Sequence, residues 1–437
     1  MASASDASKY EEILIESNDQ SKSIDLKLGT ISVDYYEDIF SPTITAKIVV
    51  TNTGDSIDGQ SIYQGLPLRG GERVSLKIAG NAGRPGLDFS QKSDYLYVSA
   101  ITNVIGNNQS ESFVLNLCSR EAITNETVRV MNKYPSSSPI STSVEDIIKL
   151  LGTSKKVTVD KTMNPYGFIG NMRKPFTVLT WLASKGVPEL KGDGTAGYFF
   201  YETKEGYNFR SVDKLIEQKP KATVFSTDIA DGENNDQDSQ ILSHATNRNS
   251  NMLEKLRLGA YSSYRVYFDP LTFKLVPENA AERKFGIKDY AGGKSKNLGE
   301  QIKLPKINQE SNLTLGDIPT RIVSGIMDRG TLEKDASTEG NADPLKYQSQ
   351  ALMRYNVLFT QSLTIMIPSN TNLHAGDIIE CNFPKTTTSK NKEYDQQQSG
   401  LYMIKELCHH FDTSGSYTSA KLIRDTFGQY GTNNKES

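Results

Sequence analysis

Three side chains that could bind a metal ion stand side by side near the C-terminus, at Cys408, His409 and His410. Thiolate sulfur and imidazole nitrogen are typical zinc ligands, and the chain has only three cysteines and four histidines. The preceding residues, "LYMIKEL", however, have the pattern of a β-strand. Consecutive strand residues point to opposite faces, so His409 and His410 cannot both turn toward one metal ion without breaking the strand. The pattern therefore favours a strand over a metal site.

A second candidate, "KDYAGGKS" (288–295), imitates a phosphate-binding loop because it ends in Gly-Lys-Ser. Lys288 stands where the first glycine of such a loop should be, and no apolar strand precedes it. We therefore interpret it as a surface loop and expect no bound cofactor.

Carboxylates and nucleophiles give no stronger signal. His374 has no recognisable serine or cysteine partner nearby in the sequence, and no Gly-x-Ser-x-Gly occurs. An acidic loop could ligate calcium, but its spacing is not that of an EF-hand. We expect no catalytic, cofactor-binding or metal-binding residue, and hence no enzyme. The acidic residues of that loop are Asp228, Asp231, Glu233, Asp236 and Asp238.

The aromatic run "GYFFYETKEGYNF" (197–209) could stack on sugars or bases. Such a run more often forms the packed face of a hairpin against a helix, and we expect that helix to be the one that contains Trp181. We expect a hairpin that turns at Glu205-Gly206.

Period-two alternation predicts β-strands in the first 120 residues. The runs "SPTITAKIVVTN" (41–52), "ERVSLKI" (72–78) and "SFVLNLCSR" (112–120) each place apolar residues on one face. Two of these faces consist of Ile44, Ala46, Ile48 and Val50, and of Phe113, Leu115 and Leu117.

The character changes after Arg120. "STSVEDIIKLLG" (141–152) has a Ser or Thr cap, a glutamate three residues after Thr142 and a closing glycine, which predicts a helix. A second helix is predicted in "PFTVLTWLASKGVP" (175–188). The middle of the chain is therefore expected to be a separate α+β unit.

An internal repeat connects the two β-rich regions. "LRGGERVSLKI" begins at Leu68 and "LHAGDIIECNF" at Leu373, and each reads Leu, two residues, Gly, an acid and then a strand. The glycine precedes a strand tyrosine by 26 residues in both copies, Gly71 to Tyr97 and Gly376 to Tyr402. When the two copies are aligned on these residues, Cys408-His409-His410 corresponds to 103–105. The next strand of each copy ends in an arginine, Arg120 in the first and Arg424 in the second.

These patterns predict an α+β, mainly β chain with two related antiparallel β-barrel (tube-like) domains and an α+β middle domain. The 437 residues are enough for about three domains. The expected division is 1–120, first barrel; 121–250, middle domain; 251–276 with 346–428, second barrel; 277–345, loop-rich insertion; and 429–437, tail.

Composition excludes several classes. The net charge is −3 and the Lys and Arg residues are scattered, which does not predict nucleic-acid affinity. No apolar run approaches the ~20 residues that cross a bilayer, so we expect no membrane anchor. The three cysteines are far apart, and no disulfide framework is indicated.

Several stretches together resemble the baseplate central hub proteins of contractile-tailed, T-even-like bacteriophages. The most specific stretch is the one nearest the C-terminus (397–428), which has a strand that begins Gly-x-Tyr-x-Ile, then a histidine, then a closing Arg-Asp before Phe-Gly. The stretches that carry the resemblance are "DIFSPTITAKIVV" (38–50), "NPYGFIGNMRKPFTVLTWLASKGVP" (164–188), "GYFFYETKEGYNFRSVDKL" (197–215), "AGDIIECNFPK" (375–385) and "QQSGLYMIKELCHHFDTSGSYTSAKLIRDTFG" (397–428).

The resemblance implies a homotrimer whose six barrels match the six-fold tail tube protein ring, while the trimer receives the three-fold central spike protein. It also implies contacts with baseplate wedge proteins, a place in the virion tail after assembly in the host cytoplasm, and a channel through which DNA passes only as cargo. Barrel edges in 44–51 and 113–119, with counterparts in 255–268 and 417–424, are candidates for the ring contacts. The candidate interface residues are Ile44, Ala46, Ile48, Val50, Phe113, Leu115 and Leu117.

Two alternatives stay open. The chain could be the hub of a related contractile injection machine, a secretion system or a bacteriocin, although such hubs are usually fused to a β-helical needle and no repetitive β-helix follows Gly428. It could also be a tail-associated glycan-binding protein that uses the aromatic hairpin.

Overall fold

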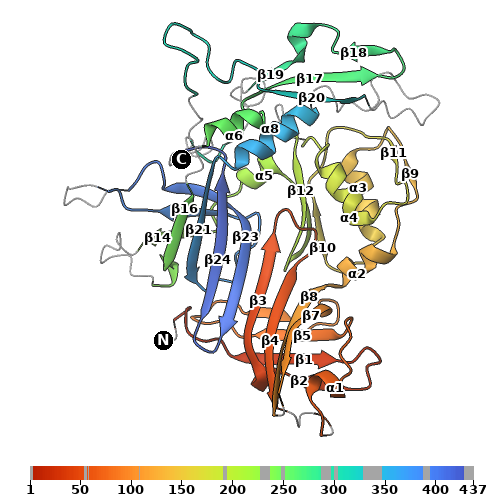
Figure 1. Cartoon of the computed structure of the whole chain (residues 1–437), viewed down its shortest axis with the longest axis vertical. Coiled ribbons are helices and arrows are strands. Elements are labelled where there is room, and N and C mark those ends of the chain that lie inside the picture. The colour runs from red at the N-terminus through yellow and green to blue at the C-terminus, as the bar shows by residue number, and fades with distance from the viewer. Residues whose placement is uncertain are drawn as a thin grey trace.

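Strands dominate the computed structural model of this chain (Figure 1). The predicted class, mainly β with antiparallel sheets and an α+β middle part, is confirmed. The structure describes residues 3–53, 57, 59–107, 109–189, 194–226, 237–247, 251–286, 297–299, 304–327, 347–386 and 394–427.

The first barrel is a strongly curled sheet with the strand order β3-β4-β8-β7-β5-β1-β2, in which β6 pairs with β5. Its inward face holds one hydrophobic cluster that includes Val33, Ile48, Val74 and Leu115. The alternation that predicted these strands arises because every second side chain enters this cluster. The elements are β1 (Tyr10–Glu16), β2 (Ser23–Asp25), η1 (Lys27–Gly29), β3 (Thr30–Asp38), β4 (Thr45–Thr53), α1 (Ile62–Gly65), β5 (Arg73–Ile78), β6 (Leu87–Phe89), β7 (Leu96–Gly106) and β8 (Ser110–Ser119).

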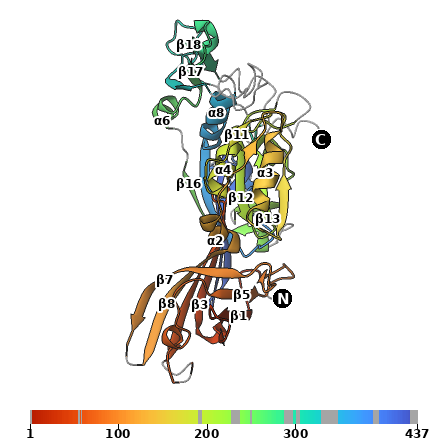
Figure 2. The same cartoon turned by 90° about the vertical axis from the view of Figure 1, so that its right-hand side faces the viewer.

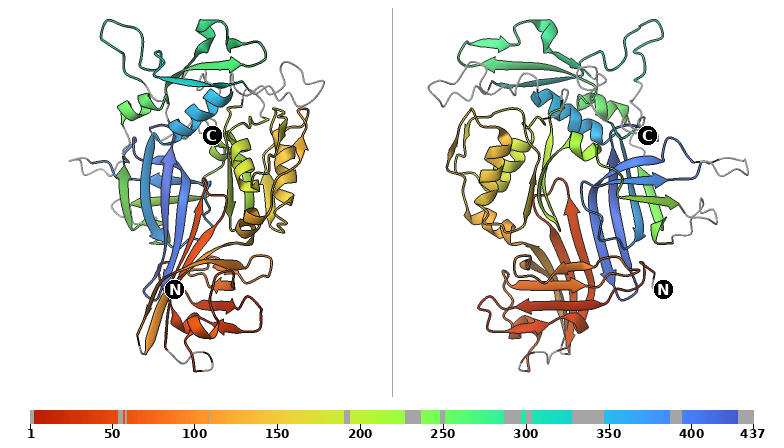
Figure 3. Two further views of the ribbon diagram at one scale, coloured as in Figure 1. Left: turned by 45° about the vertical axis from the view of Figure 1, so that its right-hand side comes forward. Right: turned by 180° about the vertical axis from the view of Figure 1, so that it is seen from behind.

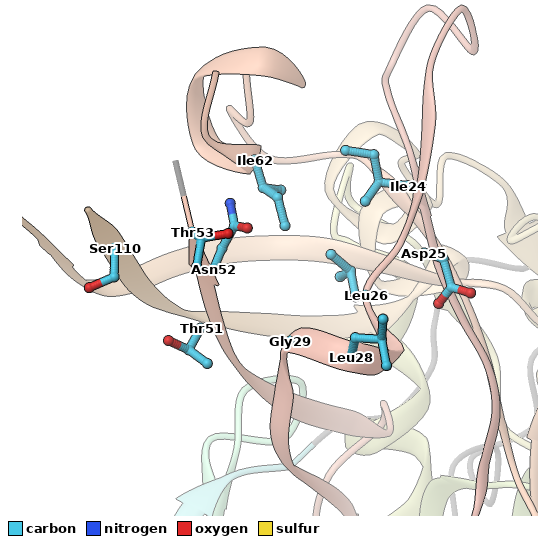
Figure 4. A pocket seen from close by; sticks show the side chains of 10 residues that line it. All are labelled: Ile24, Asp25, Leu26, Leu28, Gly29, Thr51, Asn52, Thr53, Ile62 and Ser110. Carbon is cyan, nitrogen blue, oxygen red and sulfur yellow. The ribbon is translucent and has the colours of Figure 1, made fainter. Parts of the chain in front are cut away.

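This barrel is not closed by a β2–β3 ladder, because the second edge of β3 pairs with a strand of the other barrel. A hollow of about 450 Å³ lies between β2, η1 and the end of β4 (Figure 4). Leu26, Ile24 and Ile62 are among its lining residues, and Leu28 at its rim is fully exposed. The hollow marks the gap that the incomplete barrel leaves at this end.

The second barrel repeats this arrangement with the order β16-β21-β24-β23-β22-β14-β15. Its own cluster includes Ile365, Ile379, Ile404 and Leu422. Two pairings, β14 with β22 and β14 with β15, are parallel. The elements are β14 (Ala222–Ser226), η3 (Gln237–Ser239), β15 (Gln240–Ile241), β16 (Ser243–Asn247), β21 (Gln361–Pro368), β22 (Ile378–Asn382), β23 (Gly400–Asp412) and β24 (Ser416–Arg424).

The middle domain contains both predicted helices beside a three-stranded sheet (Figure 2). The first helix begins at Ile140 with Pro139 as its N-cap, so the predicted Ser or Thr cap is wrong; Ser141 and Thr142 lie inside the first turn. The second helix has Pro175 at its start and ends at Ala183. The elements are α2 (Arg120–Thr127), β9 (Lys133–Tyr134), α3 (Ile140–Lys149), β10 (Lys156–Val159), β11 (Phe168–Ile169), α4 (Pro175–Ala183), β12 (Tyr198–Thr203), β13 (Gly206–Ser211) and α5 (Val212–Ile216).

The predicted aromatic hairpin forms, but β12 and β13 are joined by the two-residue turn Lys204-Glu205, one residue before the predicted Glu205-Gly206, because Gly206 already pairs with Thr203. Its rings are buried and pack on one another and on Phe176 of α4. Trp181 instead contacts Tyr166 and Phe168 edge to face, with ring centroids 5.4 Å apart in both pairs. The hairpin therefore packs on α4, the helix that contains Trp181, but it does so through Phe176.

An insertion separates β16 from β21 and carries its own four-stranded sheet, at the end of the molecule opposite the first barrel (Figure 3). The sequence predicts that residues 251–276 join the second barrel; instead β17 pairs with β18, β19 and β20. Strand propensity at 262–269 was correct, but the partners come from within the insertion. The elements are α6 (Met252–Arg257), β17 (Ser262–Asp269), β18 (Lys274–Val276), η4 (Ala280–Arg283), β19 (Lys284–Gly286), β20 (Arg321–Ile326) and α8 (Gln348–Leu358).

A buried ion-pair cluster ties these parts together. The Arg354 guanidinium on α8 is fully buried and donates to Asp213 of α5 at 3.1 Å and to Asp425, just after β24, at 3.3 Å. Asp213 also accepts from the Thr195 backbone N–H, and Asp425 from that of Leu298. The middle domain, the insertion and the second barrel therefore share one set of charge-assisted hydrogen bonds.

Candidate functional site: the sheet that joins the two barrels

One continuous antiparallel sheet runs through both barrels. Its eight strands follow the order β7-β8-β4-β3-β23-β24-β21-β16, and every neighbouring pair is hydrogen-bonded. Four strands come from each barrel, and Figure 1 shows β4, β3, β23, β24 and β21 side by side. The two barrels are therefore joined through their backbones.

The internal repeat is visible in matching hydrogen bonds. The Gly71 N–H donates to the Val98 carbonyl at 2.7 Å, and the Gly376 N–H donates to the Ile404 carbonyl at 2.8 Å. Val98 and Ile404 return the bond, each at 2.9 Å, to the carbonyl of the acidic residue after the glycine. Both glycines have positive φ, +92° and +88°, which the tight turn requires.

The acid of the repeat caps its own turn. The Glu72 carboxylate accepts from the Arg69 backbone N–H at 2.7 Å, and Asp377 accepts from that of His374 at 2.8 Å. The Gly-acid pattern seen in the sequence is thus a turn motif that appears twice.

The frame of the repeat differs by one residue from the sequence-based alignment. Because Val98 matches Ile404, Tyr402 corresponds to Leu96 rather than Tyr97, and Cys408 corresponds to Thr102. A register shift follows at the same place in both copies, between Val98 and Ala100 and between Ile404 and Glu406. The segment between turn and strand is one residue longer in the second copy, which spacing alone could not locate.

The junction of the barrels is the β3–β23 ladder, which runs from Asp38 opposite Glu406 to Ser32 opposite Asp412. On its inner side Phe411 is buried and belongs to the core cluster of the first barrel, although its strand belongs to the second. His409 lies parallel to the Tyr35 ring, with centroids 6.0 Å apart. The two barrels therefore share core residues as well as hydrogen bonds.

His410 lies on the other side of the ladder, so the prediction that the adjacent histidines face opposite ways is confirmed. Its Nδ1 lies 2.5 Å from Asp34 Oδ1 and its Nε2 lies 3.0 Å from Asp412 Oδ2. Burial alone would lower the pKa of His410, but these two carboxylates raise it overall. Among the described residues no group of three or more His, Cys, Asp or Glu side chains could hold a metal ion.

A buried carboxylate, Glu37, joins three parts of the chain at this junction. It accepts hydrogen bonds from the backbone N–H groups of Lys204 (2.8 Å) and Ala375 (2.9 Å) and from the Tyr35 hydroxyl (2.8 Å). His374 Nδ1 lies 3.1 Å from the same carboxylate. Burial opposes ionisation, but the charge and hydrogen bond of His374 and the two backbone donors lower the pKa of Glu37 overall.

The pairing with Glu37 predicts a pH-dependent stability. Burial lowers the pKa of His374, but Glu37 raises it above the usual 6.5 overall, with Asp377 adding to the rise and Lys221 opposing it. A raised histidine pKa stabilises the folded protein fully below pH 6.5, and this contribution is lost as the pH rises through the folded-state pKa. We expect the stability gap between wild type and His374→Gln to shrink from pH 6 to pH 9, as measured by urea midpoints.

A matched control for this measurement is His244→Gln, which changes an exposed histidine on β16. A wild-type-to-His374→Gln gap that is constant across this pH range would contradict the assigned ion pair.

The seven candidate interface residues lie inside the first barrel. All are 0–1% exposed and belong to its core cluster, so their side chains do not reach the surface. Their strands are paired at both edges, β4 with β3 and β8, and β8 with β4 and β7. The faces that these strands turn outward carry alternate residues such as Lys47 and Asn116. The residues are Ile44, Ala46, Ile48, Val50, Phe113, Leu115 and Leu117.

Of the two ranges predicted to be their counterparts in the second barrel, one lies in that barrel and the other does not. Residues 417–424 form β24, the match of β8, whereas 255–268 lies in the insertion, and the match of β4 is β21. Sequence reasoning missed β7 and β16, the two ends of the eight-stranded sheet. The exposed side chains of Val104 and Ile105 in β7 are the signal that could have indicated this edge.

Two other candidates lie partly or wholly outside the described residues. These are the Gly-Lys-Ser loop (288–295) and the acidic residues Asp228, Asp231, Glu233 and Asp236. Asp238 is described and accepts a hydrogen bond from the Ala4 N–H at 2.8 Å.

The fold is that of phage tail proteins. It matches the 43 kDa tail protein of prophage MuSo2 from Shewanella oneidensis (TM-score 0.52, 10% identity, 95% of this chain and 100% of the other). It also matches a tail protein from Neisseria meningitidis MC58 (TM-score 0.52, 9% identity, 95% and 96%).

In sequence the chain is similar to the probable baseplate hub protein gp334 of Vibrio phage KVP40. The two are 21% identical over 381 residues, which cover 84% of this chain and 85% of the other. No protein-family model matches the sequence. The resemblance to phage baseplate hub proteins is thus confirmed.

The helices offer no membrane span. Within the described residues, none is both long and apolar enough to cross a bilayer.

Proposed function

We propose that this protein is a structural hub subunit of a contractile phage tail baseplate, without catalytic activity, and that three copies form a ring. The observation that carries the proposal is the eight-stranded sheet, which consists of two matching sets of four strands. Three such sheets contain six equivalent sets, which would present six-fold symmetry to a tail tube protein ring. The trimer as a whole would retain three-fold symmetry for a central spike protein.

The dimensions of such a ring suit a channel. Twenty-four strands spaced ~4.8 Å apart add up to roughly 115 Å measured perpendicular to the strands, and the tilt of roughly 35–45° that a closed barrel requires widens the ring to roughly 45–50 Å across, backbone to backbone. On the outward face of the junction, acidic and basic residues are paired: Lys405 with Asp38 at 2.8 Å and Lys421 with Glu406 at 2.9 Å. A wall of balanced charge would let DNA pass without holding it.

The remaining partners follow from this placement. The middle domain and the insertion lie beside or beyond the sheet and would contact baseplate wedge proteins in the virion tail (Figure 3). A glycan-binding role has no support from the aromatic hairpin, because Tyr198, Phe200, Tyr207 and Phe209 are all at most 4% exposed. If the chain were instead the hub of a secretion system or a bacteriocin, it would form the same ring.

Size-exclusion chromatography with light scattering tests the proposal. We expect a species of about 145 kDa, three times the chain mass of 48.4 kDa, and six lobes around an open centre in negative-stain averages. A protein that stays monomeric at tens of micromolar would contradict a self-assembling trimer.

A further inference from the structure

We propose that the outer edge of the middle domain binds an acidic protein segment that carries apolar side chains. The inference rests on the proposed hub function, in which the middle domain contacts neighbouring baseplate proteins, and it specifies the surface and the chemistry of one such partner. The surface consists of three exposed apolar residues, here called the ribbon patch, and of basic residues around them. The ribbon patch is Met131, Ile169 and Met172.

A short two-stranded ribbon brings the patch together. In it β9 pairs antiparallel with β11, and Lys133 lies opposite Ile169. Further along the ribbon, the Met172 N–H donates to the Val130 carbonyl at 3.1 Å. Because side chains alternate along a strand, Met131 and Ile169 point to the side opposite the buried Val130. The ribbon therefore holds the three apolar residues close together at its surface.

The ribbon patch is uncovered in the single chain. Met131 is 65%, Ile169 is 44% and Met172 is 61% exposed. Figure 1 shows β9 and β11 at the right-hand edge of the molecule, with α3, α4 and β12 between them and the sheet that joins the barrels. The patch therefore lies away from the proposed ring wall, where another protein can reach it. Apolar side chains that gather on a surface in this way mark an interaction site.

The backbone at Met172 gives an independent reason for this assignment. The Arg173 N–H donates to the Gly170 carbonyl at 3.1 Å and closes a turn whose central residues, Asn171 and Met172, have φ of +55° and +59°. Asparagine tolerates this left-handed region, but methionine is strained there, and a glycine would fit without strain. An exposed methionine adds nothing to the core and weakens its own turn. Its side chain is therefore best explained by a contact outside the chain.

The charge around the patch defines the partner. Residues 128–144 and 161–188 contain six basic residues and no Asp or Glu, in a chain whose net charge is −3. Within the described part of the chain, Arg173 has no carboxylate partner, and the nearby Glu126 already pairs with Lys174. Apolar residues with a basic surround favour a partner that has carboxylates around apolar side chains. The six basic residues are Arg129, Lys133, Lys161, Arg173, Lys174 and Lys185.

Nucleic acid accounts for only half of these features. Phosphates would pair with the basic residues but would leave Met131, Ile169 and Met172 without a contact. An acidic protein segment with leucine or isoleucine between its carboxylates matches both the charge and the apolar side chains.

A peptide probe tests the assignment. We would titrate the full-length protein into a fluorescein-labelled peptide that carries leucines among aspartates and glutamates, and follow the fluorescence anisotropy. The matched peptide has lysine in place of each acid. We expect the acidic peptide to bind with a dissociation constant of about 10–100 μM, to bind about fivefold more weakly at high salt, and to bind far better than the basic peptide.

Two variants locate the binding site. Met131→Ser with Ile169→Ser, and separately Arg173→Glu, should each raise the dissociation constant about tenfold. All three residues are exposed, so the circular dichroism spectrum should stay that of wild type. The matched control is Arg257→Glu, which reverses an exposed arginine beside the exposed Leu253 on α6 and should leave the dissociation constant unchanged.

Met172→Gly separates the contact from the fold. Glycine removes the strain at positive φ, so the urea midpoint should stay at or above that of wild type. Peptide binding should nevertheless weaken at least about fivefold, because the exposed side chain is lost. A methionine with a purely structural role would show the reverse, a lower midpoint and an unchanged affinity.

The outcomes distinguish this inference from the hub proposal. An acidic peptide that binds no better than the basic one, or that binds Arg173→Glu and Met172→Gly as tightly as wild type, would overturn the acidic partner and leave a trimeric hub intact. A duplex DNA oligonucleotide that binds more tightly than the peptide and tolerates Met131→Ser with Ile169→Ser would also overturn it. A protein that binds the acidic peptide but forms no trimer would contradict the hub proposal alone.

Discussion

Replacing Arg354 with methionine should lower the free energy of unfolding by about 3–5 kcal/mol. The change keeps a long side chain but leaves Asp213 and Asp425, 2% and 0% exposed, without their shared cation. A buried charge that loses its partner costs more than the pair contributed, because it is already removed from water. Urea unfolding followed by circular dichroism measures the effect.

The control is Lys149→Met, which breaks an exposed ion pair with Asp146. Such pairs are worth well under 1 kcal/mol, so the urea midpoint should barely move. If Arg354→Met were as mild as this control, the buried cluster would not hold the three parts of the chain together.

Phe411→Ala should cost a similar amount, about 3–5 kcal/mol, since it empties a large volume in a packed core. Phe411 is carried by the second barrel and buried in the first, so the loss should fall on the junction. We expect backbone amides of β3 and β23 to exchange hydrogen faster in the variant. Hydrogen exchange with mass spectrometry checks this directly.

Phe273→Ala provides the matched control. The same side chain is removed, but Phe273 is 81% exposed on the insertion, so stability should stay within about 0.5 kcal/mol of wild type. Equal losses in the two variants would mean that Phe411 does not fill a core position.

Local patterns in the sequence predicted the parts of the fold that depend on local physics. Alternation identified which residues of β4 and β8, together with Ile44 just before β4, lie on one face, and all seven are core residues. The Gly-acid pattern identified a turn that occurs twice with matching hydrogen bonds.

Pairing between distant segments could not be predicted in this way. Strand propensity at 262–269 does not reveal that its partners lie in the insertion. Nor does alternation reveal whether an apolar face meets its own barrel or a neighbouring chain, and the seven candidate interface residues belong to the face that meets its own barrel. Glu37 was also missed, because two of its partners are backbone N–H groups that no sequence pattern marks and its ion-pair partner His374 is 337 residues away in the sequence.

The fusion of two matching strand sets into one chain changes how such a ring would assemble. The β3–β23 junction forms within a single molecule, so it does not depend on protein concentration. In the proposed ring, three of the six junctions would exist as soon as each chain folds, and two association steps would join the three chains, because the last junction closes within the trimer. Six separate barrels would need five such steps. Each avoided encounter saves the translational and rotational entropy of one association step. A duplicated subunit could therefore close its ring at concentrations where six separate barrels would stay dispersed.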